Sequence, residues 1–233
     1  MKIFVTGASG FIGTELIKEI SKENEIVTFD LENGQNILNF EQLKESIKGC
    51  EVVIHLAALR KPYEDKTFED YFRTNVEGTF NVAQACLENG VKKMIYSSST
   101  SYYGVEEGIP FQKPIKESNL TVTQNVKENE LKCRDCDVAY STSKVMAEQV
   151  LANYGLRKKF QVIILRLGPT RKTGEYRPFG ELKLHLKVEN AVQAIEKSIN
   201  NKNEIWYEAF TITDKVDGVD ISKAEKLLGY KPE

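Results

Sequence analysis

The stretch Lys2–Gly13, which reads KIFVTGASGFIG, contains the pattern that decides the fold. A short β-branched run ends at Thr6, a glycine-rich turn follows, and apolar residues at helical spacing continue to Lys22. Glycines permit a tight turn and a close approach of the backbone to a pyrophosphate, and a helix N-terminus offers unpaired N–H groups to the phosphates. The sequence therefore predicts a strand, a phosphate-binding turn and a helix. The residues expected at this turn are Gly7, Ser9, Gly10, Phe11, Ile12 and Gly13.

An acidic residue, Asp30, closes the second predicted strand, Glu25–Asp30. A carboxylate at this position can accept hydrogen bonds from both hydroxyls of an adenosine ribose, and it would repel a 2′-phosphate. No lysine or arginine follows Asp30 until Lys44. The predicted cofactor is therefore NAD rather than NADP. The alternative interpretation is that Asp30 only caps a helix that starts at the strand end.

Short β-branched runs alternate with longer helical stretches along the rest of the chain. Apolar strands flanked by helices require a parallel sheet covered on both faces. The predicted fold class is α/β, a doubly wound parallel sheet (Rossmann fold) with a reduced C-terminal substrate lobe. Residues 1–167 are expected to form the NAD-binding domain, and residues 168–233 the small lobe with a closing strand and helix. The expected strands are Lys2–Thr6, Glu25–Asp30, Glu51–Leu56, Lys93–Ser97, Phe160–Arg166 and Ile205–Phe210; the expected helices are Phe11–Lys22, Phe40–Ile47, Phe68–Asn89, Ala139–Tyr154 and Glu189–Asn200.

Composition excludes several classes of protein. A formal net charge of -2, with basic and acidic residues interspersed, gives no electrostatic argument for nucleic acid or an anionic membrane as a partner. No stretch approaches the roughly 18 apolar residues of a membrane span, and Met1 runs into a strand rather than a signal peptide. Cys133 and Cys136 form one C-x-x-C pair, and His55 and His185 are the only histidines, too few ligands to predict a zinc site. We expect a cytoplasmic protein without a metal.

The run Tyr140–Lys144 starts a predicted helix and places a phenol and an ammonium one turn apart on one face. A free tyrosine has a pKa of about 10 and is a poor base at neutral pH. A neighbouring ammonium, helped by the positive nicotinamide of NAD⁺, stabilises the phenolate and makes proton abstraction feasible. The same spacing also occurs on ordinary surface helices. The glycine turn earlier in the chain favours the catalytic interpretation.

In these motifs the chain resembles the extended short-chain dehydrogenase/reductase family, in its NAD-dependent epimerase/dehydratase group. The resemblance covers nearly the whole chain, with the motifs in the family's order. Besides the glycine turn and Tyr140–Lys144, the similar segments are Asn36-Ile37, His55–Ala58, Asn75–Thr79, Ser97–Gly104, Leu165–Pro169 and Ile221–Pro232.

The resemblance implies roles for individual residues. Ser99 would hydrogen-bond the reacting hydroxyl, Tyr140 would remove its proton, and Lys144 would hold the ribose and lower the pKa of the tyrosine. Ser99 could instead cap a turn, since three serines stand together. A homodimer through Phe68–Asn89 and Ala139–Tyr154 is implied as well. The remaining residues implied to contact the cofactor are Asn36, Ile37, Leu56, Ala57, Ala58, Arg60, Asn75 and Ser97, together with Tyr140 and Lys144.

Departures from the family narrow the substrate. Dehydratases of the family carry an Asp-Glu pair after the strand-end serine, and this chain has Thr100 and Ser101 there. Only about twenty residues separate Pro169 from the helix near Glu189, which leaves little room for a nucleotide anchor. The compactness resembles uronate dehydrogenases, whose substrate carboxylate an arginine fork could bind. The residues expected to contact substrate are Ser99, Thr100, Arg171 and Arg177; both arginines could equally face solvent from a loop.

The sequence therefore predicts an NAD-dependent oxidoreductase that acts on a hydroxyl of a sugar or nucleotide sugar. One alternative is a uronate-dehydrogenase-like enzyme for a small free sugar acid. Another is a non-catalytic NAD-binding redox sensor, which would not need Ser99, Tyr140 and Lys144. The long polar segment Gly104–Asp137 is expected to be a loop or lid over the site.

Overall fold

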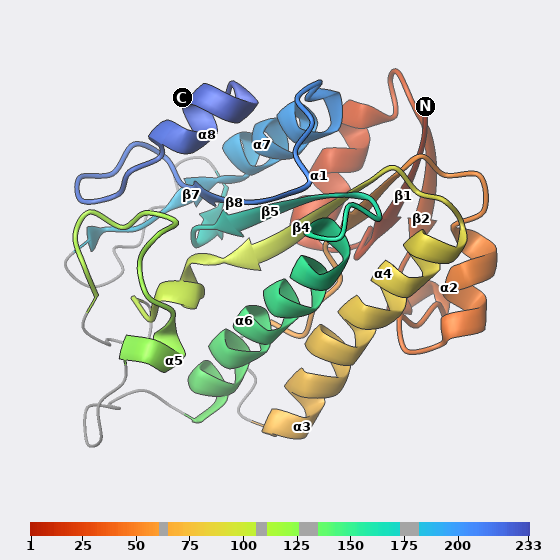
Figure 1. Ribbon diagram of the computed structural model, residues 1–233, viewed down its shortest axis with the longest axis horizontal. Coiled ribbons are helices and arrows are strands. Elements are labelled where there is room, and N and C mark those ends of the chain that lie inside the picture. The colour runs from red at the N-terminus through yellow and green to blue at the C-terminus, as the bar shows by residue number, and fades with distance from the viewer. Residues whose placement is uncertain (61–64, 106–110, 126–134, 173–181) are drawn as a thin grey trace.

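The protein is described by a computed structural model that covers residues 1–60, 65–105, 111–125, 135–172 and 182–233. Its centre is a parallel sheet of six strands in the order β2-β1-β3-β4-β5-β8 (Figure 1). These strands are β1 (Lys2–Thr6), β2 (Glu25–Phe29), β3 (Val52–His55), β4 (Lys93–Ser99), β5 (Gln161–Leu167) and β8 (Tyr207–Ile212). The doubly wound α/β fold predicted from the sequence is confirmed.

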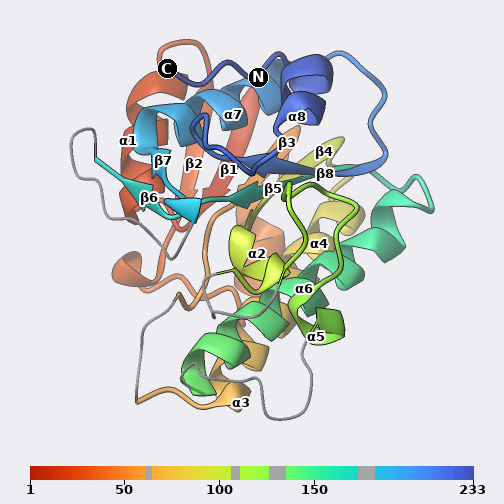
Figure 2. The same cartoon turned by 90° about the vertical axis from the view of Figure 1, so that its left-hand side faces the viewer.

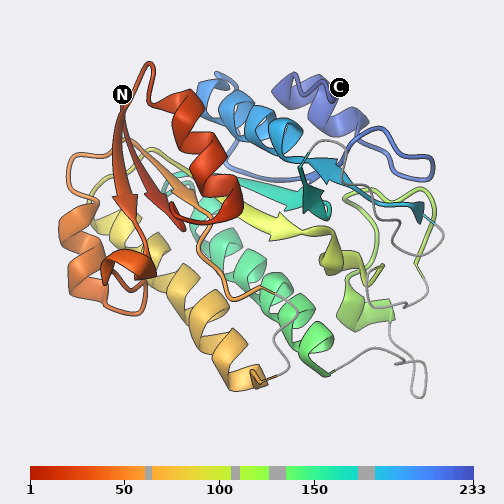
Figure 3. The same cartoon turned by 180° about the vertical axis from the view of Figure 1, so that it is seen from behind.

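Helices cover both faces of this sheet. The helices α1, α7 and α8 lie on one face, and α2, α4 and α6 on the other (Figures 1 and 3). Their bounds are α1 (Phe11–Ile20), α2 (Phe40–Ser46), α3 (Phe68–Tyr71), α4 (Gly78–Glu88), α5 (Val122–Asn125), α6 (Asp135–Gly155), α7 (Val188–Asn200) and α8 (Ser222–Leu228). Burial on both faces explains why the central strands are apolar runs without polar alternation.

The order of the strands reverses between β1 and β3, because the chain first adds β2 on one side of β1 and then β3 on the other. Ligands of open α/β sheets bind at the carboxyl ends of the strands beside such a reversal. The glycine turn after Thr6 and the loop after His55 leave these two strands at that edge. The fold thus brings together the segments predicted to hold the cofactor.

The predicted helix Phe68–Asn89 is present but interrupted. A capping box between Thr67 and Asp70 starts α3, and residues Phe72–Glu77 are π-helical before α4 begins at Gly78. Single π-turns inside α-helices occur mostly at functional sites. The apolar pattern of Phe68–Asn89 predicted one continuous helix, so it did not reveal this π-helical segment.

Much of the predicted lid, Gly104–Asp137, lies outside the described residues. The part that is described packs against the domain: Ile115 is buried, pairs with Val219 and belongs to a cluster with Tyr103 and Leu182. A short parallel pair, β6 (Thr170–Arg171) and β7 (Leu186–Lys187), follows β5 and stands apart from the main sheet (Figure 2). The division of the chain at Leu167 stays a prediction. No helix among the described residues is both long enough and apolar enough to cross a membrane.

Two adjacent lysines at the start of β4 test the packing. The ammonium of Lys93 is buried and donates to the carbonyls of Ser198, Ile199 and Asn201 at 2.9 to 3.0 Å, where α7 ends. We expect Lys93→Met to lower the free energy of unfolding by about 2 kcal/mol, since three hydrogen bonds to a charged group are lost. The exposed Lys92 only forms a surface ion pair with Glu51, so Lys92→Met serves as the control and should change little. Urea denaturation of both variants measures the difference; equal losses would contradict this account of α7.

Candidate active site

The glycine turn is built for contact between its backbone and a ligand. Gly7 has a φ of +71°, and a Cβ there would lie 2.6 Å from the nitrogen of Ala57. A Cβ on Gly13 would lie 2.3 Å from the carbonyl oxygen of Gly7. No side chain caps the N-terminus of α1 at Gly10, and its first turn carries no acidic residue. Free N–H groups at a helix N-terminus form a natural site for a phosphate.

Asp30 lies beside this turn. One carboxylate oxygen accepts the backbone N–H of Ser9 at 2.9 Å, and the other accepts that of Glu32 at 3.1 Å. Asp30 therefore caps the 3₁₀ turn Leu31–Asn33, as the alternative interpretation expected, and it also fixes the glycine turn. Each oxygen keeps a second lone pair for another donor, so the cap does not exclude contact with a ribose.

His55, at the end of β3, connects this turn to the neighbouring helix. The hydroxyl of Thr6 accepts the N–H of Ala57 and lies 2.6 Å from Nδ1 of His55, to which it donates because the proton of the neutral ring is on Nε2. The hydroxyl of Thr79 donates to the carbonyl of Asn75, so it accepts from Nε2 of His55 at 3.0 Å. Burial, and less strongly Lys144, lowers the pKa of His55 to about 3. His55 is therefore neutral, and it links Thr6 to Thr79 by hydrogen bonds.

Asn75, in the π-helical stretch, joins the loop after β3 to α6. Its side chain accepts from the nitrogen of Leu59 at 2.7 Å and donates to the carbonyl of Leu59 and to the hydroxyl of Ser143. Ser143 in turn donates to the carbonyl of Tyr140. The side chain of Asn75 is only 1% exposed. Asn75 therefore holds Leu59 against α6, and its predicted contact with the cofactor stays a prediction.

Lys144 is the most constrained charge at the candidate site. It is 2% exposed, and its ammonium donates to the carbonyl of Ser97 at 2.9 Å and to the hydroxyl of Tyr96 at 3.3 Å. The ammonium lies 5.9 Å from the ring centroid of Tyr140. Burial lowers the pKa of Lys144 to about 7, although the carboxylate of Glu148 raises it. The predicted phenol and ammonium therefore lie together, next to the end of β4.

The three strand-end serines have different partners. Ser97 accepts Lys144 through its carbonyl. Ser98 donates to the carboxylate of Glu148 at 2.6 Å. Ser99 is 8% exposed, accepts the N–H of Ser101 and donates to its hydroxyl, both at 3.1 Å. Ser99 therefore caps the 3₁₀ turn Thr100–Tyr103, which was the alternative interpretation of this residue.

Other predicted contact residues are placed less uniformly. Thr100 is fully buried, with its hydroxyl 3.4 Å from the carbonyl of Leu167, so its side chain points into the protein rather than toward a substrate. Asn36 is exposed, whereas Ile37 is 6% exposed and packs in the core against Gly78. The loop residues Leu56, Ala57 and Ala58 are half-buried and Arg60 is exposed.

The predicted substrate arginines are only partly described. Arg171, on β6, is half-buried and its guanidinium donates to the carbonyl of Thr170 at 2.9 Å. Arg177 lies outside the described residues, as does Cys133. Among the residues that the structure describes, no three His, Cys, Asp or Glu side chains gather as metal ligands would.

Two buried residues of this region were not predicted. Glu148 follows Lys144 by four residues on α6, and its carboxylate binds the guanidinium of Arg166 on β5 at 2.7 Å. The spacing i, i+4 from Lys144 was a signal that could have found Glu148. Nothing local in the sequence marks Arg166 as its partner.

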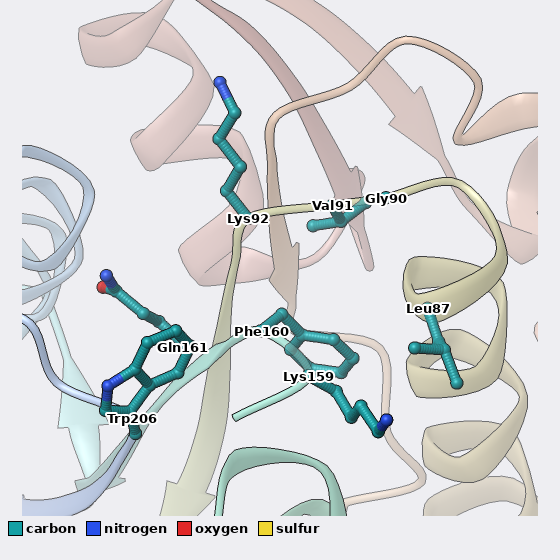
Figure 4. A pocket seen from close by; sticks show the side chains of 8 residues that line it. All are labelled: Leu87, Gly90, Val91, Lys92, Lys159, Phe160, Gln161 and Trp206. Atoms are coloured by element: carbon teal, nitrogen blue, oxygen red, sulfur yellow. The ribbon is translucent and has the colours of Figure 1, made fainter. Parts of the chain in front are cut away.

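A cavity of about 320 Å³ lies at the opposite edge of the sheet (Figure 4). Its lining comes from the segments that lead into β4, β5 and β8, which are the amino ends of those strands. The glycine turn, Lys144 and Tyr140 are absent from it, so we do not count it as the candidate active site. Its lining residues are Leu87, Gly90, Val91, Lys92, Lys159, Phe160, Gln161 and Trp206.

Fold and site together define a nucleotide-binding domain with a tyrosine–lysine helix beside its strand ends. Residues 3–219 match the family model described as the NAD dependent epimerase/dehydratase family. The chain belongs to this family, and NAD, the cofactor predicted from the sequence, is the cofactor that the family uses.

Individual relatives are more distant. UDP-glucose 4-epimerase of Vibrio cholerae is 28% identical over 97% of this chain and 73% of its own length. The match covers only 43% and 33% of two other curated relatives, so the chain spans less than half of their length. UDP-glucuronic acid 4-epimerase from Bacillus cereus, solved with UDP-glucuronic acid and NAD, superimposes with a TM-score of 0.79 at 21% identity, covering 100% of this chain and 94% of that one. A mutated uronate dehydrogenase gives 0.71 at 16% identity, covering 100% and 81%.

The glycine turn yields a prediction about cofactor binding. Gly13→Ala forces a Cβ against the carbonyl oxygens of Gly7 and Ala8, so we expect a loss of about 3 kcal/mol or more in stability and loss of NAD binding. Gly10→Ala is the matched control, since its Cβ would meet only the Gly7 oxygen, at 3.2 Å. Thermal denaturation and NAD titration by calorimetry measure both variants. Stable, NAD-binding Gly13→Ala protein would contradict this geometry.

Proposed function

We propose that this protein oxidises a hydroxyl of a sugar or nucleotide sugar by hydride transfer to NAD, with Tyr140 as acid/base, Lys144 as its activator and Ser99 as a hydrogen-bonding partner of the reacting oxygen. The observation that carries the proposal is the buried ammonium of Lys144 beside the Tyr140 ring. Burying the ammonium is costly, and a negative charge beside it offsets that cost. Stabilising a phenolate is the role for which this position suits it.

The residues present fit NAD on the geometry of this chain. The turn Gly7–Gly13 packs so closely that a Cβ on Gly7 or Gly13 would meet backbone atoms, the N-terminus of α1 is uncapped, and the carboxylate of Asp30 lies against Ser9 after the end of β2. We assign the pyrophosphate to the turn and the adenosine ribose to Asp30. When bound, NAD supplies the hydride acceptor. The protein supplies position and electrostatics.

The chain's own residues would then work as follows. Tyr140 takes the proton from the substrate hydroxyl at its phenol oxygen, and Lys144 stabilises the resulting negative charge. The carbonyl of Ser97 and the hydroxyl of Tyr96 each accept one ammonium proton, which leaves the third for the phenolate or the cofactor ribose. Asn75 donates to Ser143, and Ser143 donates to the carbonyl of Tyr140, so these two bonds hold this part of α6 in place.

The relatives divide the substrate between two chemistries. The Bacillus cereus epimerase is solved with UDP-glucuronic acid, whereas the uronate dehydrogenase is named for a free sugar acid. We favour the sugar-nucleotide class, because a curated relative that matches over 97% of this chain is a UDP-glucose 4-epimerase. The half-buried Arg171 supports the alternative, since a guanidinium near the strand ends can bind a carboxylate. We place the reaction in the cytoplasm, where the free thiols of Cys50 and Cys86 stay reduced.

Removal of the Tyr140 hydroxyl tests its assignment as the acid/base. We expect Tyr140→Phe to lower kcat by about 100-fold or more, because general acid/base catalysis is lost while the ring remains. NAD⁺ is supplied with UDP-glucose, UDP-glucuronic acid, glucuronate and galacturonate. NADH is followed by absorbance, and sugar interconversion by chromatography.

The control for this variant is Tyr154→Phe on the same helix, whose hydroxyl only contacts Gln84; its kcat should match the wild type. Net NADH with a free uronate supports the dehydrogenase alternative, and interconversion without net NADH supports the epimerase. NAD binding without turnover of any sugar would overturn the enzymatic proposal and leave the redox sensor.

We also propose that the partner of this chain is a second copy of itself. Four large apolar side chains on α3 and α4, or in the π-helical stretch between them, are 38% to 48% exposed: Phe68, Phe72, Phe80 and Leu87. Their spacings of four, eight and seven residues are close to those of one helix face. The helices α4 and α6 lie side by side on the same side of the sheet (Figure 1).

A charge on this face tests the dimer. We expect Phe80→Glu to convert a homodimer into a monomer, since a carboxylate at the centre of an apolar interface is left unpaired. Light scattering after size exclusion gives the mass. Leu120→Glu, at a similarly exposed site away from α3 and α4, should leave the mass unchanged. A wild-type monomer, or a dimer that survives Phe80→Glu, would contradict the proposal.

A further inference from the structure

The pair Glu148–Arg166 is the most deeply buried ion pair among the described residues. The side chains are 1% and 5% exposed. The guanidinium donates from Nε at 3.0 Å and from its second terminal nitrogen at 2.7 Å, one bond to each carboxylate oxygen. This two-bond arrangement is geometrically specific and resists sliding of one element past the other. The pair joins α6, the helix that carries Tyr140 and Lys144, to the strand β5.

The carboxylate also ties α6 to the strand that carries the serines. The hydroxyl of Ser98 donates to Glu148 at 2.6 Å. Ser98 lies between Ser97, which holds Lys144, and Ser99. If Glu148 moved, Ser98 would move with it, and the positions of Ser97 and Ser99 on either side of Ser98 would change.

The guanidinium reaches the turn that follows Ser99. It stacks on the ring of Tyr102, with its central carbon 3.4 Å from the ring centroid, and donates to the hydroxyl of Tyr103 at 3.0 Å. It also contacts the carbonyl of Glu117 at 3.3 Å, and the carboxylate of Glu117 accepts the N–H of Thr211 on β8. One side chain thus contacts the 3₁₀ turn Thr100–Tyr103 and the segment beyond Gly104.

We propose that Glu148 and Arg166 are positioning residues that fix the tyrosine–lysine helix relative to the strand end of Ser99 and the turn after it. Neither side chain is assigned contact with substrate or cofactor. The inference rests on the proposed function, since it concerns the geometry of that site. A buried ion pair is weak as a source of stability but suited to specifying one arrangement, because its partners tolerate little displacement.

Electrostatics adds a second consequence. Burial lowers the pKa of Lys144, and the carboxylate of Glu148 is the charge that opposes this. Removing the carboxylate therefore lowers the pKa further, so the ammonium is lost at a lower pH as the pH rises. The groups that face the ammonium are Tyr96 and Ser97 from β4, Tyr140 and Glu148 from α6, neutral His55 from β3, and Arg166 from β5 behind the carboxylate.

Two variants separate positioning from stability. Glu148→Gln keeps the shape and removes the charge; we expect kcat to fall about tenfold or more, KM and the Kd for NAD to stay within about threefold, and the alkaline limb of the pH profile to move to lower pH. The double variant Glu148→Gln/Arg166→Met removes the unpaired guanidinium as well. It should regain the thermal stability that Glu148→Gln loses, but not the kcat.

The control is Lys93→Met, which also removes a buried charge but at the far end of β4. It should lose stability and keep kcat within about twofold of the wild type, since it touches only the end of α7. A double variant with wild-type kcat, or Glu148→Gln with an unchanged pH profile and kcat, would overturn the proposal. If Glu148→Gln does not fold, the double variant Glu148→Gln/Arg166→Met is tested in its place.

A readout independent of turnover keeps this test distinct from that of the proposed function. If the wild type turns over no sugar, the proposed function fails, and the titration of Lys144 is followed instead by NMR of ¹³Cε-labelled lysine, assigned with Lys144→Arg. A lower titration midpoint in Glu148→Gln supports the coupling of Glu148 to Lys144. An unchanged midpoint overturns it.

Discussion

A lysine ammonium held out of water is the constraint around which this site is arranged. Lys144 is buried, and its ordinary hydration is replaced by the carbonyl of Ser97 and the hydroxyl of Tyr96. Both acceptors belong to β4, so α6 has to dock on that strand in one register for the charge to be tolerated. The same docking brings the Tyr140 ring within 5.9 Å of the ammonium. Docking of α6 on β4 therefore also brings the candidate catalytic pair together.

At the glycine turn the constraint is steric rather than electrostatic. Gly7 and Gly13 leave no room for a Cβ because backbone atoms of the turn and of Ala57 lie where it would go. Between the glycine turn and α6 runs a continuous set of hydrogen bonds, from Thr6 through His55 to Thr79, with Asn75 leading on to Ser143. Since burial keeps His55 neutral, this connection carries no charge toward Lys144. The structure thus joins the glycine turn to the buried Lys144 through side chains that carry no charge.

The sequence predicted what local chemistry decides. Three glycines after a strand, and a phenol and an amine four residues apart, have meaning within one turn of chain. The i, i+4 spacing from Lys144 marked Glu148, but its pairing with Arg166 spans 18 residues and that of Asn75 with Ser143 spans 68, so local spacing could not reveal these two contacts. Thr100 was expected to contact substrate by position, but the 3₁₀ turn capped by Ser99 directs it inward. The π-helical winding at Phe72–Glu77 was also missed, because the apolar pattern of the sequence does not distinguish it from an α-helix.

The hydride itself offers the decisive test. The sugar that the protein turns over is prepared with deuterium at the carbon to be oxidised, the reaction is quenched during turnover, and the nicotinamide of the extracted nucleotide is analysed by mass spectrometry. The account predicts deuterium in the nicotinamide with the wild type and none with Tyr140→Phe at equal NAD loading. Turnover of the sugar without deuterium in the nucleotide, or transfer that is undiminished in Tyr140→Phe, would contradict it.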